Sequence, residues 1–85
     1  MSNRPRLSDT EHKLYNLLVN AGTRGVRVKT LFYAVRGRWP EPHETNRRQQ
    51  QYVGAYISRL NLKIGRHGER IGPALARNTY QLFSH

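Results

Sequence analysis

The second half of the chain places cationic, amide and hydroxyl side chains at helical spacing around an apolar stripe. The stripe follows one face of an α-helix and consists of Val53, Tyr56, Ile57, Leu60 and Ile64. The other faces and their flanks carry Arg47, Arg48, Gln50, Gln51, Ser58, Arg59, Asn61, Lys63 and Arg66. Cationic groups bind phosphate, amides and hydroxyls read base edges, and a helix fits the major groove of DNA. The pattern predicts a helix over residues 46–64 with one face on a small core and another on a nucleic acid.

These polar residues divide into two predicted roles. The predicted phosphate contacts are Arg47, Arg48, Arg59, Lys63 and Arg66. The predicted base readers are Gln50, Gln51, Ser58 and Asn61, since amides pair bidentately with adenine. The roll of the helix decides among them, and Gln51 and Ser58 lie farthest from the apolar stripe. A merely solvated helix face is the alternative.

The charge balance favours an anionic partner. In 85 residues, 15 Lys and Arg stand against 5 Asp and Glu, giving a formal net charge of +10, and 12 of the 15 are Arg. Arginine grips phosphate with a planar fork and stacks on bases. A basic domain of this kind is typical of nucleic-acid binders. A ribosomal protein, a membrane-surface protein or simple solubility are the alternatives.

Several classes of site are excluded or disfavoured by residue content. The chain has no cysteine, which excludes disulfides, thiolate zinc sites and cysteine nucleophiles. Its 4 histidines have no ligand-like spacing, and no Ser-His-Asp order or Gly-rich phosphate loop is present. We therefore expect no enzyme, no cofactor and no metal. No apolar run approaches the ~20 residues that span a membrane, and we expect a cytoplasmic, nucleoid-associated protein.

The N-terminal third predicts an arm and a first helix. Residues 1–7 are expected to form a flexible basic arm, and residues 8–85 a single domain. Ser8-Asp9-Thr10-Glu11 has the pattern of a capping box. A helical apolar stripe follows until Gly22, so we expect a helix over residues 9–20.

The middle of the chain predicts a short extended segment, a second helix and a loop. Residues 23–28 are expected to be extended or to form a strand of one pair, and residues 29–36 to be helical without a good N-cap. Two prolines make residues 38–44 a loop. Thr45 or Asn46 can then cap the long helix, and Gly65 is expected to close it. Gly54 inside that helix indicates either tolerance or close approach by a neighbouring helix or by DNA.

The C-terminal segment predicts a β-hairpin. Residues 69–71 and 79–83 are expected to be strands with Gly72-Pro73 turning the chain, and the tip at 74–78 carries Arg77 as a phosphate or minor-groove contact. The fold class is therefore α+β, a winged helix-turn-helix of three helices with a C-terminal β-hairpin wing. The third helix would enter a major groove while the wing reaches the flanking backbone or minor groove.

The aromatic residues other than tryptophan are expected in the core because their spacing is helical or alternating. Trp39 stands apart, in the proline-bounded loop. It either fills the core or offers a contact to a protein partner.

The order of these segments resembles the OmpR/PhoB-type winged-helix effector domain of bacterial response regulators, over about residues 7–83. The resemblance rests on Ile57-Ser58-Arg59-Leu60 with Lys63-Ile64-Gly65, on Leu7, Ser8, Glu11, Leu14, Leu17 and Leu18, and on Tyr80 with Leu82. It implies recognition-helix roles for Arg59 and Lys63, and a loop at 38–44 that meets RNA polymerase. Gly54, Arg27 and the glycine-free run 76–80 depart from the family pattern. With no receiver domain in this sequence, we expect a free-standing regulator without phosphorylation control, encoded by a phage, a plasmid or another mobile element.

Three functions compete on this sequence. The first is a sequence-specific regulator of transcription that binds double-stranded DNA and pairs as a homodimer on two half-sites. The second is a winged-helix interaction module that binds RNA polymerase or another regulator through the Trp39 loop. The third, an RNA-binding or ribosomal domain, is disfavoured because no exposed aromatic platform motif is present.

Overall fold

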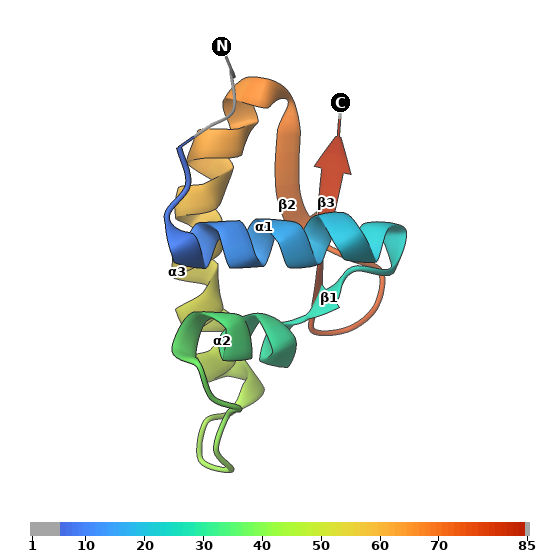
Figure 1. The fold of residues 1–85 in the computed structure, drawn as a ribbon. Helices are drawn as coiled ribbons and strands as arrows, with labels where there is room; N and C mark the ends of the chain where they lie inside the picture. The colour runs from blue at the N-terminus through green and yellow to red at the C-terminus, as the bar shows by residue number, and fades with distance from the viewer. Residues whose placement is uncertain (1–5, 85) are drawn as a thin grey trace.

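A computed structural model describes residues 6–84, so residues 1–5 of the expected N-terminal arm lie outside it. The helices are α1 (Asp9–Ala21), α2 (Val28–Arg36) and α3 (Asn46–Ile64), with 3-10 turns η1 (Gly22–Arg24) and η2 (Gly65–His67). The strands are β1 (Val26–Arg27), β2 (Glu69–Pro73) and β3 (Thr79–Ser84). They form one antiparallel sheet in the order β1-β3-β2 beside the helices (Figure 1). The predicted α+β class and winged helix-turn-helix arrangement are confirmed.

Helix α1 begins as the capping box predicts. The hydroxyl of Ser8 accepts a hydrogen bond from the N–H of Glu11 at 3.3 Å, and the Glu11 carboxylate accepts one from the N–H of Ser8 at 2.8 Å. The helix runs one residue past the expected end, and Gly22 stops it with a φ of 59°. Leu14 and Leu18 are completely buried, so this helix supplies one wall of the core.

The expected extended segment is the short strand β1. Val26 pairs with Tyr80 and Arg27 with Thr79, which joins β1 to the hairpin as a third strand. The approach is so close that a Cβ at Gly25 would lie 2.5 Å from the carbonyl oxygen of Tyr80, and the φ of Gly25 is +72°. Only glycine fits this position without strain.

Helix α2 starts at Val28, one residue before the expected start, and has no side-chain cap within the described chain. The hairpin supplies a substitute, because the N–H of Val28 donates to the carbonyl of Asn78 at 2.8 Å. Leu31 and Phe32 are buried against the other helices. The start of α2 is therefore held by a residue distant in sequence.

Helix α3 has the predicted bounds, and Thr45 is its cap, accepting from the N–H of Arg48 at 3.3 Å. Gly65 closes the helix as predicted, since it is the C-cap and its N–H donates to the carbonyl of Asn61. It does so with a helical φ of −58°, so the chain continues through η2, and Gly68 with a φ of 77° makes the reversal. Among the described residues nothing lies within 4 Å of a Cβ built on Gly54, so the alternative of a close neighbouring helix is wrong.

The hairpin differs from the prediction at its turn. Gly72 and Pro73 belong to β2, paired with Gln81 and Tyr80, and do not turn the chain. Pro73 is accommodated because β2 is an edge strand of the sheet. The turn is residues 74–78, closed by a hydrogen bond of 2.9 Å from the N–H of Ala74 to the carbonyl of Thr79. Asn78 takes a positive φ of 53°, which asparagine tolerates better than most residues.

The core is a single cluster where the three helices meet the sheet. Its fully buried members include Leu14, Leu18, Leu31, Val53, Leu60 and Ile64. Of the aromatic residues expected there, Phe32 is buried and Tyr15, Tyr56, Tyr80 and Phe83 are half-buried. The expectation is wrong for Tyr33 and Tyr52, which are 45% and 38% exposed, although the Tyr52 ring still contacts that of Phe32.

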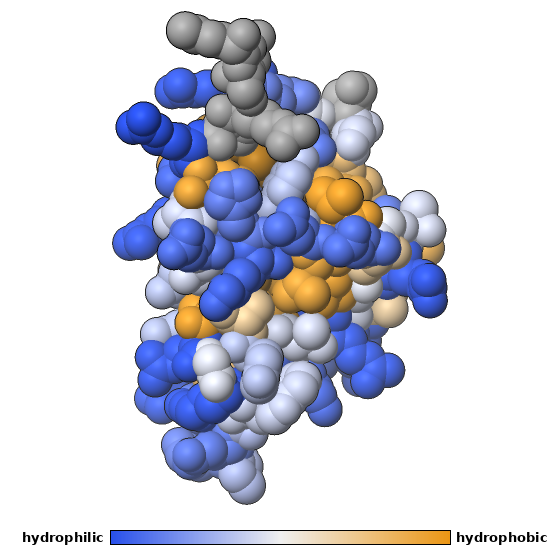
Figure 2. Space-filling view, in the orientation of Figure 1, coloured by the Kyte–Doolittle hydropathy of each residue, from blue (hydrophilic) through white to orange (hydrophobic). Residues whose placement is uncertain are grey.

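The face of the molecule seen in Figure 2 is mostly hydrophilic. On the face that carries α1, apolar surface shows only in patches above and below this helix (Figure 2). No helix within residues 6–84 has the length and apolar character needed to cross a membrane.

Candidate nucleic-acid interface

The roll of α3 is fixed by its buried residues. Val53, Ile57 and Leu60 face the core, so the opposite face is turned to solvent. Successive exposed residues along that face are Gln51, Ala55, Ser58 and Leu62, at spacings of 4, 7 and 11 from the first. The structure thus places Gln51 and Ser58 at the centre of the outer face, where a groove-bound helix would present its base readers.

Three arginines flank this outer face. Arg47 lies on one side of it, whereas Arg48 and Arg59 lie on the other, and all three are exposed. No acidic residue occurs in α3. Phosphates on both walls of a groove could therefore meet cations on both sides of the helix.

Asn61 does not belong to the outer face. Its amide donates to the carbonyl of Ile71 at 3.0 Å and accepts from the N–H of Ile71 at 2.7 Å. This two-way bond ties α3 to β2 and engages both ends of the amide. The prediction that Asn61 reads bases is therefore wrong, and the residue is a structural link.

Lys63 is also committed within the fold. Its Nζ atom lies 2.6 Å from Oε1 of Glu11, a residue only 4% exposed at the start of α1. Burial works to raise the pKa of Glu11, but the hydrogen bonds from Lys63 and Ser8 outweigh it and the pKa is lowered. Lys63 thus neutralises a buried carboxylate, and this engagement argues against its predicted role as a phosphate contact.

The wing is attached to the first half of α3. Nε2 of Gln50 donates to Oδ1 of Asn78 at 2.7 Å, while the carbonyl of Asn78 caps α2. The exposed Arg77 is next to this junction. Gln50 is therefore primarily a link to the wing, and Arg77 lies on the same end of the domain as the N-terminal half of α3.

A shallow hollow beside this junction gathers cations from three elements. Arg27 from β1, Lys29 from α2 and Arg77 from the wing all line it. Sequence reasoning missed Arg27 and Lys29. The alternation Val26-Arg27-Val28, with both valines buried, was the signal that turned Arg27 outward.

The structure does not bring Arg66 to this cluster. Arg66 lies in η2, past the end of α3, while the wing meets α3 at Gln50. At ~1.5 Å per helical residue the two positions are roughly 24 Å apart along the axis. Arg66 is exposed, but only a ligand that extends along α3 would meet both it and Arg77.

The loop at 38–44 is braced and holds Trp39 at the surface. Arg38 donates to both carboxylate oxygens of Glu44, at 2.6 and 3.1 Å. The hydrogen bond from Arg38 and one from the N–H of Glu41 lower the pKa of Glu44 to about 2. Trp39 is 53% exposed, so the alternative that it fills the core is wrong. Its ring packs against that of the exposed Tyr33 at a centroid distance of 4.5 Å and a tilt of 36°, and Nζ of Lys29 lies over the Trp39 ring, 5.9 Å from its centroid.

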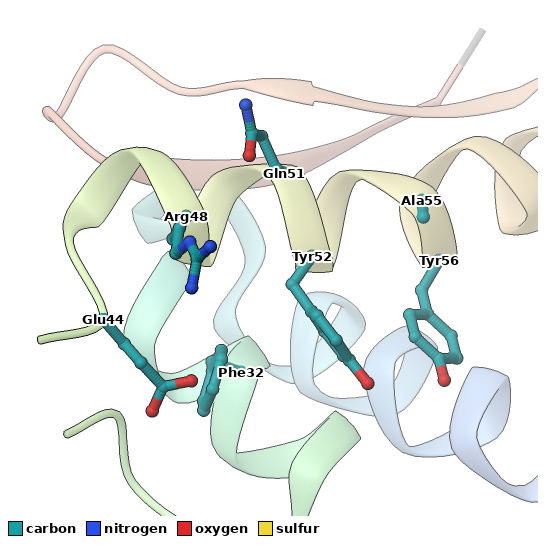
Figure 3. Close-up of a pocket in the computed structure, with 7 residues that line it drawn as sticks. All are labelled: Phe32, Glu44, Arg48, Gln51, Tyr52, Ala55 and Tyr56. Atoms are coloured by element: carbon teal, nitrogen blue, oxygen red, sulfur yellow. The ribbon is translucent and has the colours of Figure 1, made fainter.

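A second hollow lies between α3 and α2 (Figure 3). Tyr52 and Tyr56 point from α3 toward α2 and α1, whereas Gln51 points away from them. The hydroxyl of Tyr52 accepts a hydrogen bond from Arg36 at 2.6 Å. The one carboxylate that lines this hollow, Glu44, is already engaged by Arg38. The hollow therefore offers a packed aromatic wall rather than a set of groups for acid–base chemistry.

Clusters of metal-binding side chains are also absent from the part of the chain that the structure describes. No cluster of three or more His, Asp or Glu side chains is placed to hold an ion there.

No family model, curated protein or solved structure matches the chain. The case for a function therefore rests on the geometry and charge of α3 and the wing.

Proposed function

We propose that the protein is a sequence-specific regulator of transcription that binds double-stranded DNA. In this proposal α3 enters a major groove and the wing contacts the flanking backbone or minor groove. The observation that carries it is the outer face of α3, where Gln51 and Ser58 are exposed between arginines on both sides. Because Val53, Ile57 and Leu60 face the core, Gln51 and Ser58 are turned to solvent.

The chemistry of each part suits duplex DNA. Gln51 can pair bidentately with adenine, and the Ser58 hydroxyl can bond to several base edges in the major groove. Arg47, Arg48 and Arg59 can contact phosphates on the groove walls and fix the register of the helix. The proposal further places the chain among OmpR/PhoB-type effector domains, supported by the motif in α3 and by the helix and strand order.

A single domain of this size offers few base contacts, so we propose that two copies bind adjacent half-sites. Its site of action would be the nucleoid. This part of the proposal is supported by the charge of +10, which favours association with DNA wherever DNA is present.

The direct test is a binding titration with labelled duplex DNA of mixed sequence, competed by single-stranded DNA and by duplex RNA. The proposal expects duplex DNA to compete best. It also expects Arg48→Ala and Arg59→Ala to weaken binding, whereas Lys13→Ala on the exposed side of α1 should not. Equal competition by duplex RNA would contradict the proposal and favour an RNA-binding domain.

A second candidate function rests on the Trp39 loop. An exposed tryptophan packed against an exposed tyrosine, held by the Arg38–Glu44 pair, has the aromatic character of a protein-binding hot spot. The partner proposed is RNA polymerase. The test compares how tightly the wild type and Trp39→Ala bind purified RNA polymerase. Val19→Ala, which removes an exposed apolar side chain from α1, is the matched control. Loss of binding in Trp39→Ala alone, with DNA binding intact, would favour this function.

A further inference from the structure

Two shallow hollows lie side by side at the N-terminal end of α3. They share three lining residues, Lys29, Asn46 and Gln49. The first is the cationic hollow described above, which Arg27 and Arg77 also line. The second is bordered by the loop between α2 and α3, and Trp39 lines it. A ligand that spans both hollows would meet positive charge at one end and an aromatic ring at the other.

The indole ring of Trp39 is the aromatic wall of the second hollow. More than half of this residue is exposed. The ring of Tyr33 supports it at a centroid distance of 4.5 Å, and Nζ of Lys29 lies 5.9 Å from its centroid. An exposed aromatic ring offers a flat π face on which any nucleobase can stack. The ammonium group beside the ring is placed to meet a phosphate next to that base.

The charges differ between the two hollows. The first is lined by Arg27, Lys29 and Arg77 and by no acidic residue. The second contains the carboxylates of Glu41 and Glu44 beside the shared Lys29. Carboxylates repel phosphate, so phosphates should occupy the first hollow and an uncharged base the second.

One class of ligand has this division of charge. A single strand of nucleic acid carries anionic phosphates next to unpaired bases that stack on aromatic rings, whereas a duplex keeps its bases stacked on one another. We propose that this surface binds single-stranded nucleic acid, with a base stacked on Trp39 and neighbouring phosphates on Lys29 and Arg27. The surface is separate from the outer face of α3. It would be a second binding site that does not depend on the proposed function.

The first test uses the fluorescence of Trp39, which is the only tryptophan of the chain. Titration of the whole chain with oligothymidylate, whose bases do not pair with one another, is expected to quench this emission as a base stacks on the indole. The quenching should persist at about 150 mM salt, where attraction to phosphate alone is weakened. Oligouridylate, titrated in parallel, shows whether DNA or RNA is the tighter strand. Binding of either strand without a change in emission would overturn the proposal.

Variants of Trp39 separate stacking from simple apolar contact, with affinity measured by the anisotropy of a fluorescein-labelled oligothymidylate. Trp39→Leu keeps an apolar side chain without a π face, and it should bind about tenfold more weakly. Trp39→Tyr keeps a ring and should bind nearly as well as the wild type. Val19→Ala, on the exposed side of α1, is the control. Equal affinities of Trp39→Leu and the wild type would overturn the proposal.

The phosphate half of the site is tested by salt dependence. Lys29→Ala should reduce the slope of log affinity for the strand against log salt by about 0.7, the value for one phosphate of a single strand. Lys13→Ala removes an exposed lysine of α1 and should leave the slope unchanged. An unchanged slope in Lys29→Ala would contradict the placement of phosphates in the first hollow.

Arg59→Ala distinguishes this site from the proposed duplex site. Arg59 flanks the outer face of α3, so its loss should weaken binding to duplex DNA but not to the single strand. If Arg59→Ala loses the strand and Trp39→Leu keeps it, the strand lies on α3 and the inference fails, while the proposed function stands. If the protein binds the strand through Trp39 but does not bind duplex DNA, the inference stands and the proposed function fails. Emission that changes with purified RNA polymerase and with neither strand would assign the ring to a protein partner and overturn the inference.

Discussion

Gln50 on α3 donates a hydrogen bond of 2.7 Å to the side chain of Asn78 in the wing turn. The backbone carbonyl of the same asparagine accepts the first N–H of α2 at 2.8 Å. One residue therefore fixes the wing against both helices of the helix-turn-helix. In the proposed complex, this junction would keep the wing at a set distance from the groove that α3 occupies.

We predict that Asn78→Gly uncouples the wing from α3 without unfolding the domain. Glycine accepts the φ of 53° and keeps the carbonyl for α2, but it has no acceptor for Gln50. Hydrogen exchange of the amides of residues 74–77 should become faster. Asn78→Asp keeps an acceptor and should exchange like the wild type. Unchanged exchange in Asn78→Gly would show that the side-chain bond does not hold the wing.

Arg59 and Lys63 lie one helical turn apart on α3, yet they should respond differently to substitution. Arg59 is exposed, so Arg59→Ala should weaken binding to all duplexes and reduce the slope of log affinity against log salt by about 1. Lys63 is bonded to Glu11, so Lys63→Met should leave that slope unchanged. It should lower the free energy of unfolding by about 1–2 kcal/mol, because the ammonium group is partly exposed and screened. Salt titrations and urea unfolding of both variants measure the two effects, and a reduced salt slope in Lys63→Met would contradict the assignment.

Stability is predicted to fall in acid through two carboxylates. The hydrogen bond from Arg38 lowers the pKa of Glu44 from 4.5 to about 2, and Lys63 and Ser8 lower that of Glu11 in spite of its burial. The unfolded chain therefore takes up protons first as the pH falls. The stabilisation is fully present above about pH 5 and is lost as the pH falls through the folded-state values. Urea unfolding from pH 6 downward toward pH 2 should show the decline.

The matched variant for the acid prediction is Glu11→Gln. Its amide is uncharged at every pH and therefore takes up no proton in acid. Its free energy of unfolding should be lower at neutral pH and should fall less steeply in acid than that of the wild type. A decline as steep as in the wild type would mean that Glu11 does not contribute.

Two glycines offer a contrast between required and tolerated positions. Gly25→Ala should destabilise the domain by about 1–3 kcal/mol from the positive φ alone, and its Cβ would also meet the Tyr80 carbonyl at 2.5 Å. Gly54→Ala has open space and should stabilise α3 by up to ~1 kcal/mol. Thermal unfolding compares them. If Gly54→Ala also weakens binding to DNA, the glycine serves close approach to DNA, and if binding is unchanged, the glycine is simply tolerated.

The features that the sequence predicted well are those set by residues close together in the chain. The capping box at Ser8 and Glu11, the periodic stripe of α3 and its Thr45 cap depend on residues within a few positions of each other. These patterns carry their own geometry, which is why the helices and the fold class were confirmed.

The errors came from contacts between distant residues. Asn61 bonds to a strand 10 residues away, and Lys63 pairs with an acid 52 residues away. Neither partner is visible in the spacing of α3. Gly72-Pro73 has the composition of a turn, yet an edge strand tolerates it. The need for glycine at position 25 likewise arises only when β1 meets β3.

The central claim is that the outer face of α3 reads a DNA sequence, and selection from a pool of random duplexes tests it most directly. At about 150 mM salt, where attraction to phosphate alone is weakened, the wild-type protein should enrich a defined motif. Gln51→Ala should lose preference at one or more positions of that motif. Asn61→Ala is the control, because Asn61 also carries an amide but bonds it to the backbone of Ile71 within the domain. If this variant remains folded, it should enrich the same motif as the wild type. A pool that shows no enrichment, with binding that only fades as salt is raised, would contradict the account.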